Sequence, residues 1–276
     1  MGIVNVTPDS FSGDGVLRDR DLNGSAFVQA AIAAALQMVV DGAEILDIGG
    51  ESTRPGANPV AASDEIARIV PVIQALAQET DVPISIDTSK AEVARAALDA
   101  GASMVNDVWG LLADRELGPL IAERGAPVVL MDNRSAAAKV AIDPRLGGQY
   151  LGTTSEDIVA DVTAQLERRI QAATDAGIDE ARIIVDPGLG FGKTPAQNLV
   201  LIRRLDALKV LGRPILVGPS RKSFIGAVLG TPPSDRIEGT AAAIACAILG
   251  GATILRVHDV KPIARVARMT DAILGR

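Results

Sequence analysis

Short runs of apolar residues alternate with longer amphipathic segments along the whole chain. The short runs are four or five residues long and rich in Val and Ile, which is typical of strands that are buried on both faces. Gly, Pro or polar residues follow each run and end its apolar pattern. The pattern predicts eight strands, at 2–6, 44–48, 83–87, 103–106, 127–131, 183–186, 214–217 and 253–257.

The longer segments carry apolar residues at helical spacing and predict helices at 25–41, 62–78, 91–100, 115–124, 155–176, 195–209, 235–249 and 261–274. Residues at the boundaries support several of them. Ser89 is a candidate N-cap for the third helix, and Pro195 suits a first helical turn. Glycines that we expect to adopt a left-handed conformation follow four of the helices, at Gly42, Gly101, Gly125 and Gly177.

A strand followed by a helix, repeated eight times in 276 residues, favours a (β/α)8 barrel. An open doubly wound sheet usually carries a Gly-x-Gly-x-x-Gly turn after its first strand, whereas residues 5–10 read Asn-Val-Thr-Pro-Asp-Ser. Residues 136–154 lack a pattern and predict a long loop. Because nothing resembles a linker, we expect one α/β domain spanning residues 1–276.

Composition narrows the class of protein. Aromatic residues make up only 2% of the chain, so the core must be filled by Ala, Val, Ile and Leu. A net charge of −7 argues against nucleic acid as the main partner, and no apolar stretch is long enough to predict a membrane span. Met1 leads directly into the first strand, so we expect a short upstream segment to be missing.

The single cysteine, Cys246, excludes an intrachain disulfide and a thiolate zinc site, and it favours a reducing cytosol. It lies in the long apolar run 241–249. We therefore expect Cys246 to be a small buried residue of a helix rather than a nucleophile.

Polar residues stand at nearly every strand end, where a barrel places its active site. Side chains two positions apart in a strand lie on the same face. The pairs that share a face are Ile45 and Asp47, Met104 and Asn106, Ile184 and Asp186, and the trio Ile254, Arg256 and His258. This alternation predicts one pocket at the barrel mouth that holds the side chains of Asp87, Asn106, Asp186, Arg256 and His258.

The carboxylates and the amide suit a planar heterocycle that carries several N–H donors. The cationic side chains suit a phosphate or a carboxylate; they are Arg54, Arg221, Lys222, Arg256 and His258. Other polar residues are also compatible with a structural role. Asp47 and Asp107 fit interior positions bonded to backbone, Glu51 and Arg54 fit an ion pair that shapes a loop, and Trp109 fits packing.

Seven motifs, in order along the chain, resemble those of bacterial dihydropteroate synthases. They are NVTPDSFS at 5–12, DIGGESTRPG at 47–56, IDT at 86–88, NDV at 106–108, DPGLGFGK at 186–193, SRKSF at 220–224 and RVHD at 256–259. Each motif is weakly specific alone, but seven in register over the whole chain are highly specific.

The resemblance implies a homodimeric (β/α)8 barrel of the cytoplasm that uses Mg²⁺ and is the target of sulfonamides. Such an enzyme condenses 6-hydroxymethyl-7,8-dihydropterin diphosphate with p-aminobenzoate and releases diphosphate. The substrates are thus small molecules, with neither nucleic acid nor membrane as partner. Aniline nitrogen is itself a nucleophile, so the reaction needs no Ser–His or Cys–His pair.

The family's site residues carry over by motif. The pterin site would comprise Asp87, Asn106, Met131, Asp186, Phe191, Lys222 and Arg256, of which Asp186, Lys222 and Arg256 would be catalytic. The p-aminobenzoate site would comprise Thr53, Arg54, Pro55 and Ser220. Asn5, Arg256 and His258 would bind diphosphate, with Asn5 also binding Mg²⁺.

Three positions depart from the family's usual pattern. Gly13 stands where an Asp helps to order the first loop, and Asp132 replaces a His after the fifth strand. Pro219 removes a backbone donor before Ser220. Asp132 points away from the face of Met131, so we expect its effect to be modest. Two alternatives remain: a catalytically silent pterin-binding paralogue and a pterin-dependent methyltransferase of the related barrel superfamily.

Overall fold

A computed structural model describes residues 1–7, 24–52, 59–143, 145–152 and 155–276. Six parallel strands are hydrogen-bonded in chain order in one sheet: β1 (Gly2–Asn5), β2 (Leu46–Gly49), β3 (Ile84–Asp87), β4 (Met104–Asp107), β5 (Val128–Met131) and β8 (Ile183–Asp186). Two more strands, β9 (Leu216–Val217) and β10 (Ile254–Leu255), pair in parallel with each other.

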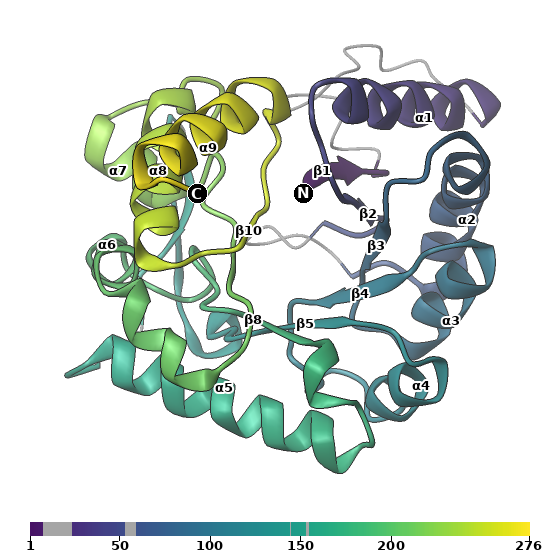
Figure 1. The fold of residues 1–276 in the computed structure, drawn as a ribbon, viewed down its shortest axis with the longest axis horizontal. Coiled ribbons are helices and arrows are strands. Elements are labelled where there is room, and N and C mark those ends of the chain that lie inside the picture. The colour runs from purple at the N-terminus through teal and green to yellow at the C-terminus, as the bar shows by residue number, and fades with distance from the viewer. Residues whose placement is uncertain (8–23, 53–58, 144, 153–154) are drawn as a thin grey trace.

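Two parallel bridges close the sheet into a ring. Val185 pairs with Ile215 and links β8 to the segment before β9, while Gly2 pairs with Val257 and links β1 to the segment after β10. The result is the expected barrel of parallel strands, with the helices arranged around its outside (Figure 1).

The predicted helices are confirmed to within a few residues at their ends. They are α1 (Ser25–Val40), α2 (Ala62–Glu79), α3 (Ala91–Ala100), α4 (Leu117–Arg124), α5 (Ile158–Asp175), α6 (Pro195–Arg203), α8 (Ile237–Gly250) and α9 (Val260–Leu274). The predicted helix at 195–209 is shorter, because α6 gives way to a 3-10 segment at Leu205–Leu211.

Two features were missed by the sequence pattern. A short helix, α7 (Ser223–Leu229), follows β9, and an antiparallel hairpin of β6 (Val140–Asp143) and β7 (Gly147–Tyr150) occupies part of the predicted long loop. Each hairpin strand has only four residues, and β7 begins with two glycines, so neither shows an apolar alternation. The loop prediction for residues 136–154 is therefore wrong over the hairpin.

The helix boundaries confirm most of the capping predictions. All four glycines after the helices have positive φ, from 59° at Gly125 to 119° at Gly101. Pro195 lies in the first turn of α6, behind a capping box formed by Thr194 and Gln197. The prediction that Ser89 is the N-cap of α3 is wrong. The N-cap residue is Lys90, and the Lys90 side chain makes no capping hydrogen bond.

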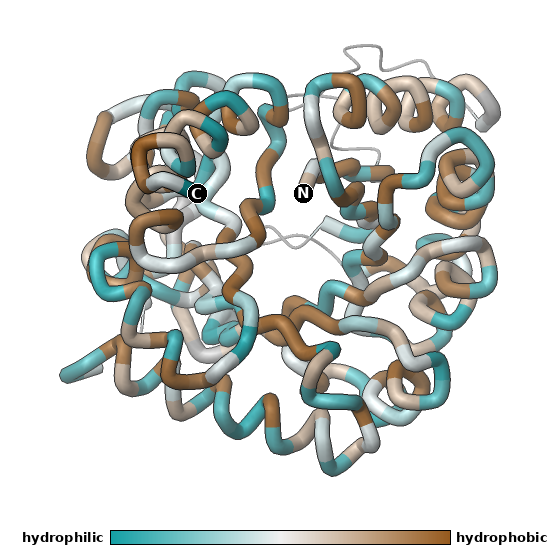
Figure 2. The backbone as a smooth tube through the Cα atoms, in the orientation of Figure 1, coloured by the Kyte–Doolittle hydropathy of each residue, from teal (hydrophilic) through white to brown (hydrophobic). Residues whose placement is uncertain are grey.

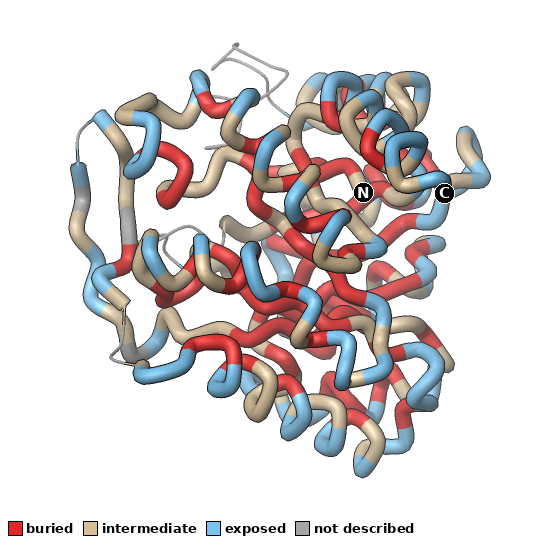
Figure 3. The backbone as a smooth tube through the Cα atoms, turned by 60° about the vertical axis from the view of Figure 1, so that its left-hand side comes forward, coloured by how far each residue is buried: buried red, intermediate tan, exposed pale blue. Residues whose placement is uncertain are grey.

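Apolar side chains form two layers. The larger layer fills the space between the strands and the surrounding helices. Hydrophobic residues are frequent along the strands (Figure 2), and buried residues run through the centre of the molecule (Figure 3). The smaller layer plugs the barrel interior with Met104, Val129 and Leu216, against which Ile45, Ile184 and Ile254 pack. These interior residues confirm the predicted strand faces. The residue two positions after an interior residue points to the same side, so polar side chains such as Asn106 and Arg256 lie at the carboxyl end of the barrel.

Cys246 is exposed on α8, so the prediction of a buried cysteine is wrong. The apolar run of α8 covers more than one face of the helix, and Cys246 lies on the face that lines a surface groove rather than the core. None of the helices in the described part of the chain combines the length and the apolarity needed to cross a bilayer.

Candidate active site

A cavity of about 380 Å³ opens at the carboxyl end of the barrel strands. Seven of the predicted site residues line it together: Asn5, Asp87, Phe191, Ser220, Lys222, Arg256 and His258. They come from the ends of β1 and β3 and from the segments that follow β8, β9 and β10. Segments distant in the sequence thus meet at one cavity, as the strand-end pattern predicts.

Arg256 links two strands across this cavity. Its Nε donates to Asp47 Oδ2 at 2.6 Å, and its Nη2 donates to Asp87 Oδ2 at 2.6 Å. Asn106 Nδ2 also donates to Asp47 Oδ2, at 3.1 Å. Burial opposes the charge on Arg256, but Asp47 and Asp87 outweigh it and raise the pKa of the guanidinium. Asp47 therefore positions Arg256 and Asn106, a role that its sequence context left open.

Asp87 lines the cavity and has one carboxylate oxygen without a hydrogen-bond partner among the described residues. Its Oδ2 bonds Arg256, whereas its Oδ1 is buried and has no hydrogen-bond partner among the described residues. Burial raises the pKa of Asp87, and Arg256 partly opposes that rise. Because an unpaired buried carboxylate oxygen is costly, this oxygen is suited to accept a hydrogen bond from a bound N–H group.

Asp186 and Lys222 are two buried groups of opposite charge that interact electrostatically. Burial raises the pKa of Asp186 to about 6, although the Gly188 N–H, which donates to Asp186 Oδ1 at 2.7 Å, favours the charged form. Burial and the nearby Arg256 lower the pKa of Lys222 to about 8. Near pH 7, one group is mostly negative and the other mostly positive.

Phe191 gives the site an apolar wall. Its ring packs with Met131 and Val108, with Trp109 against the same cluster, which confirms a packing role for Trp109. Lys222 Nζ lies 4.0 Å from the centre of the Phe191 ring, within the range of a cation–π interaction. The wall therefore also fixes the position of a charged side chain.

On the opposite side, Ser220 connects two segments of the site. Its Oγ accepts the backbone N–H of His258 at 3.1 Å and lies 3.0 Å from His258 Nδ1. Arg221 has a left-handed backbone, with φ of 57°, and its guanidinium pairs with both oxygens of Asp259, at 2.9 and 2.6 Å. The Ser220–Lys222 segment is thus tied to the segment after β10.

Comparison with known proteins identifies the family. The family model described as "Pterin binding enzyme" matches residues 1–258. The dihydropteroate synthase of Bacillus subtilis is 44% identical over 276 residues, which cover 100% of this chain and 88% of that protein. The chain belongs to the dihydropteroate synthase family. It is accordingly a transferase that makes dihydropteroate from a pterin diphosphate and p-aminobenzoate.

Solved structures of dihydropteroate synthases share the fold. The Xanthomonas albilineans enzyme with 4-aminobenzoic acid is 42% identical, has a TM-score of 0.87, and covers 100% of this chain and 93% of that one. The Yersinia pestis enzyme in a sulfonamide drug complex is 37% identical with a TM-score of 0.87, covering 100% and 94%. These relatives support the synthase, and neither alternative function gains support from them.

The remaining family residues divide into two groups. Three of them, Asn106, Met131 and Asp186, are buried beside the cavity lining. Asn106 donates to Asp47, which also binds Arg256, and Met131 packs with Phe191. Asp186 interacts electrostatically with Lys222. Thr53, Arg54 and Pro55 lie outside the described residues, as does Gly13.

Asp107 and Glu51, which the sequence left compatible with a structural role, each bind other protein groups. Asp107 accepts the backbone N–H groups of Trp109 and Leu111 at 2.8 and 2.6 Å and so shapes the turn after β4. Glu51 forms an ion pair with Lys90 at 2.6 Å. Its alternative partner, Arg54, lies outside the described residues.

The sequence pattern missed one wall of the cavity. Gly147, Gly148 and Tyr150 of the β6–β7 hairpin line it. The hairpin is held in place by Arg236, whose buried guanidinium donates to the carbonyl oxygens of Leu146 and Arg221, each at 2.9 Å. A Gly-Gly pair inside a predicted loop was the only local signal for this wall.

Proposed function

We propose that the cavity between Asp87, Lys222 and Arg256 is where this dihydropteroate synthase joins its two substrates. The observation that carries the proposal is the Asp47–Arg256–Asp87 bridge, which holds a permanent cation beside a buried carboxylate with a free oxygen. A cation and an acceptor side by side suit a substrate that combines a diphosphate with a heterocycle rich in N–H groups.

The pterin ring would be recognised by its hydrogen-bonding edge. Asp87, Asn106 and Asp186 supply acceptors and an amide for the ring N–H and carbonyl groups, and Lys222 supplies a cation for a ring acceptor. Met131 and Phe191 would pack against the ring on the apolar side of the site. A ring held in this way lies in a water-poor environment, where each hydrogen bond contributes more to binding.

The chemistry requires the side chains to stabilise separated charge. The bond between the pterin methylene carbon and the diphosphate oxygen breaks, and its electron pair leaves with the diphosphate. Ionised Asp186 stabilises the positive charge that spreads into the ring, while Arg256 and His258 stabilise the leaving diphosphate. The p-aminobenzoate nitrogen then bonds to the methylene carbon and loses one proton to solvent.

The residues at the end of β1 fit a Mg²⁺ ion that arrives with the diphosphate. The Asn5 side chain lines the cavity and offers a neutral oxygen ligand. Mg²⁺ commonly binds through one or two protein oxygens together with substrate phosphates and water. Within the described ranges, no group of three acidic, His or Cys side chains competes with this arrangement as a metal site. The ion would neutralise charge on the leaving group.

The second substrate would bind nearer the surface. By family motif, Thr53, Arg54 and Pro55 hold p-aminobenzoate together with Ser220, whose hydroxyl lines the cavity. The structures of the Xanthomonas enzyme with 4-aminobenzoic acid and of the Yersinia enzyme with a sulfonamide support p-aminobenzoate as the second substrate. We therefore expect sulfonamides to compete with p-aminobenzoate, so that their inhibition decreases as the p-aminobenzoate concentration rises.

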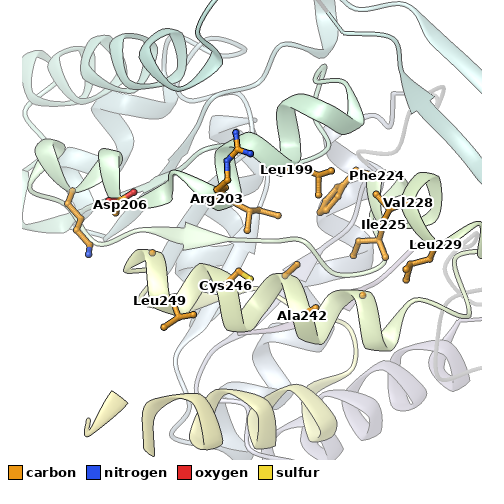
Figure 4. A pocket seen from close by; sticks show the side chains of 15 residues that line it. Leu199, Arg203, Asp206, Phe224, Ile225, Val228, Leu229, Ala242, Cys246 and Leu249 are labelled. Carbon is orange, nitrogen blue, oxygen red and sulfur yellow. The ribbon is translucent and has the colours of Figure 1, made fainter. Parts of the chain in front are cut away.

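A second copy of the chain would cover the groove beside α8. This groove, of about 730 Å³, is lined mostly by apolar side chains from α6, α7 and α8, together with the charged residues Arg203, Asp206 and Lys209 (Figure 4). Val228, Leu229 and Leu249 are each at least half exposed there. A contiguous apolar patch of this kind marks an interaction surface, and a homodimer is the assembly that the family resemblance implies.

The pH dependence of catalysis tests the assignment of Asp186 and Lys222. The value of kcat/KM for the pterin diphosphate should fall below about pH 6, as Asp186 becomes protonated, and above about pH 8, as Lys222 loses its proton. Lys222→Arg keeps the charge at all these pH values, so it should remove the alkaline limb. The substrate's own titration is the same for both proteins. A limb near pH 8 that persists in Lys222→Arg would contradict the assignment.

A further inference from the structure

Lys193 is a fully buried lysine that the reaction does not use. Its side chain has no exposed surface, and its ammonium group donates to three backbone carbonyl oxygens. These are the oxygens of Asp132 at 2.8 Å, Gly188 at 3.0 Å and Phe191 at 3.3 Å. One side chain therefore joins the loop that follows β8 to the segment that follows β5.

Asp132 supplies the counter-charge for this buried ammonium group. Asp132 Oδ2 lies 3.0 Å from Lys193 Nζ and accepts Arg134 Nε at 2.9 Å. Asp132 is itself only 4% exposed. Burying an ion pair costs desolvation energy, and an apolar pair of equal volume is often at least as stable. The ion pair is thus explained better by the geometry it imposes than by stability.

The two segments are also in close contact along their backbones. Gly188 has φ of 67°, and a Cβ there would lie 2.1 Å from the Asp132 carbonyl oxygen. Gly192 has φ of 68°, and its Cβ would lie 2.2 Å from the Arg134 carbonyl carbon. Both positions need glycine, because a side chain would separate the segments that Lys193 joins.

The loop held in this way carries the pterin side of the site. Asp186 stands at its start and Phe191 near its end, with the Phe191 carbonyl bonded to Lys193 and the Phe191 ring beneath Lys222. We propose that Lys193, neutralised by Asp132, is a positioning residue that fixes Phe191 and Lys222 for pterin binding. This inference rests on the proposed function, because it takes the pterin to bind at these residues.

Lys193→Met tests the proposal, since it leaves an unbranched side chain only one atom shorter and removes the three hydrogen bonds and the charge. Binding of 6-hydroxymethyl-7,8-dihydropterin diphosphate, measured by calorimetry with Mg²⁺ but without p-aminobenzoate, should weaken by about tenfold or more. The fluorescence of Trp109, the only tryptophan, should also change, because it packs against the cluster that contains Phe191.

Leu76→Ala is the matched control for lost stability. Leu76 is fully buried in the outer core on α2, so its truncation should lower the melting temperature and leave pterin affinity within about twofold of wild type. Asp132→Asn is a milder second variant that keeps the backbone oxygen, and it should weaken pterin binding by about threefold. If Lys193→Met does not fold, the affinity of Asp132→Asn for the pterin diphosphate tests the proposal in its place.

Weaker pterin binding in the Lys193 or Asp132 variant, together with unchanged binding in Leu76→Ala, supports the proposal. Wild-type affinity in a folded Lys193→Met protein, or in Asp132→Asn when that variant decides, overturns it. An equal loss in Leu76→Ala also overturns it, because the effect would then follow stability alone. Wild-type protein that binds no pterin overturns the proposed function, and this inference with it.

Discussion

Arg256 shows how one side chain can serve both the fold and the site. Its guanidinium lies between Asp47 and Asp87, and so joins the segment after β10 to β2 and β3 inside the barrel. The same group faces the cavity where diphosphate would bind. The alternation of each strand predicted that Asp87 and Arg256 share the barrel mouth. It could not predict which carboxylate pairs with which cation, because that depends on distances across the closed barrel.

Removal of this cation should destabilise the protein at neutral pH. Arg256→Met leaves two buried carboxylates without their counter-ion, so the free energy of unfolding in urea should fall by about 3 kcal/mol. The loss should shrink as the pH is lowered, because burial raises the pKa of Asp87 and this carboxylate becomes protonated. Adding Asp47→Asn to Arg256→Met should recover part of the lost stability. A double variant no more stable than the single one would contradict this account of the bridge.

At the scale of elements, local signals predicted most of the barrel. Apolar periodicity and terminal glycines located the strands and the helices around them, because these signals lie within a few residues of each boundary. These local signals failed where a residue distant in the sequence determines whether the element forms or how it is capped. The α3 N-terminus is capped by Asp114, whose Oδ2 accepts the Ala91 N–H at 2.8 Å, rather than by the adjacent Ser89. The β6–β7 hairpin likewise depends on Arg236 from another segment.

The two candidate caps of α3 can be compared directly. Asp114→Ala removes the acceptor of the Ala91 N–H and should lower the free energy of unfolding by about 1 kcal/mol. Ser89→Ala should change it by less than about 0.5 kcal/mol. Urea denaturation of both variants measures the difference. A larger loss in Ser89→Ala than in Asp114→Ala would show that the cap is local after all.

In the whole molecule, closure of the barrel brings the candidate site residues to one cavity, whereas the helices on one side leave an apolar groove. The strand pattern predicted the barrel and the strand-end residues at its mouth, but not the hairpin wall. It could not predict the groove, because the apolar run of α8 looks the same whether it faces the core or a second chain. Exposed Cys246 is the residue on which this ambiguity led to a wrong prediction.

A charge placed in the groove should dissociate the proposed homodimer. Leu249→Glu puts a carboxylate among the apolar residues of α7 and α8, and should give a monomer in sedimentation velocity at concentrations where wild type is a dimer. Val40→Glu, at an exposed position at the end of α1 outside the groove lining, is the matched control and should remain dimeric. Dimers of equal stability in both variants would place the interface elsewhere.

The release of diphosphate by the purified protein is the direct test of its synthase activity. The protein is supplied with 6-hydroxymethyl-7,8-dihydropterin diphosphate and Mg²⁺, with and without p-aminobenzoate, and the diphosphate formed is measured over time. We expect release to depend on p-aminobenzoate and to match the formation of dihydropteroate mole for mole. Pterin binding without p-aminobenzoate-dependent release would contradict the account and indicate a protein that only binds pterin.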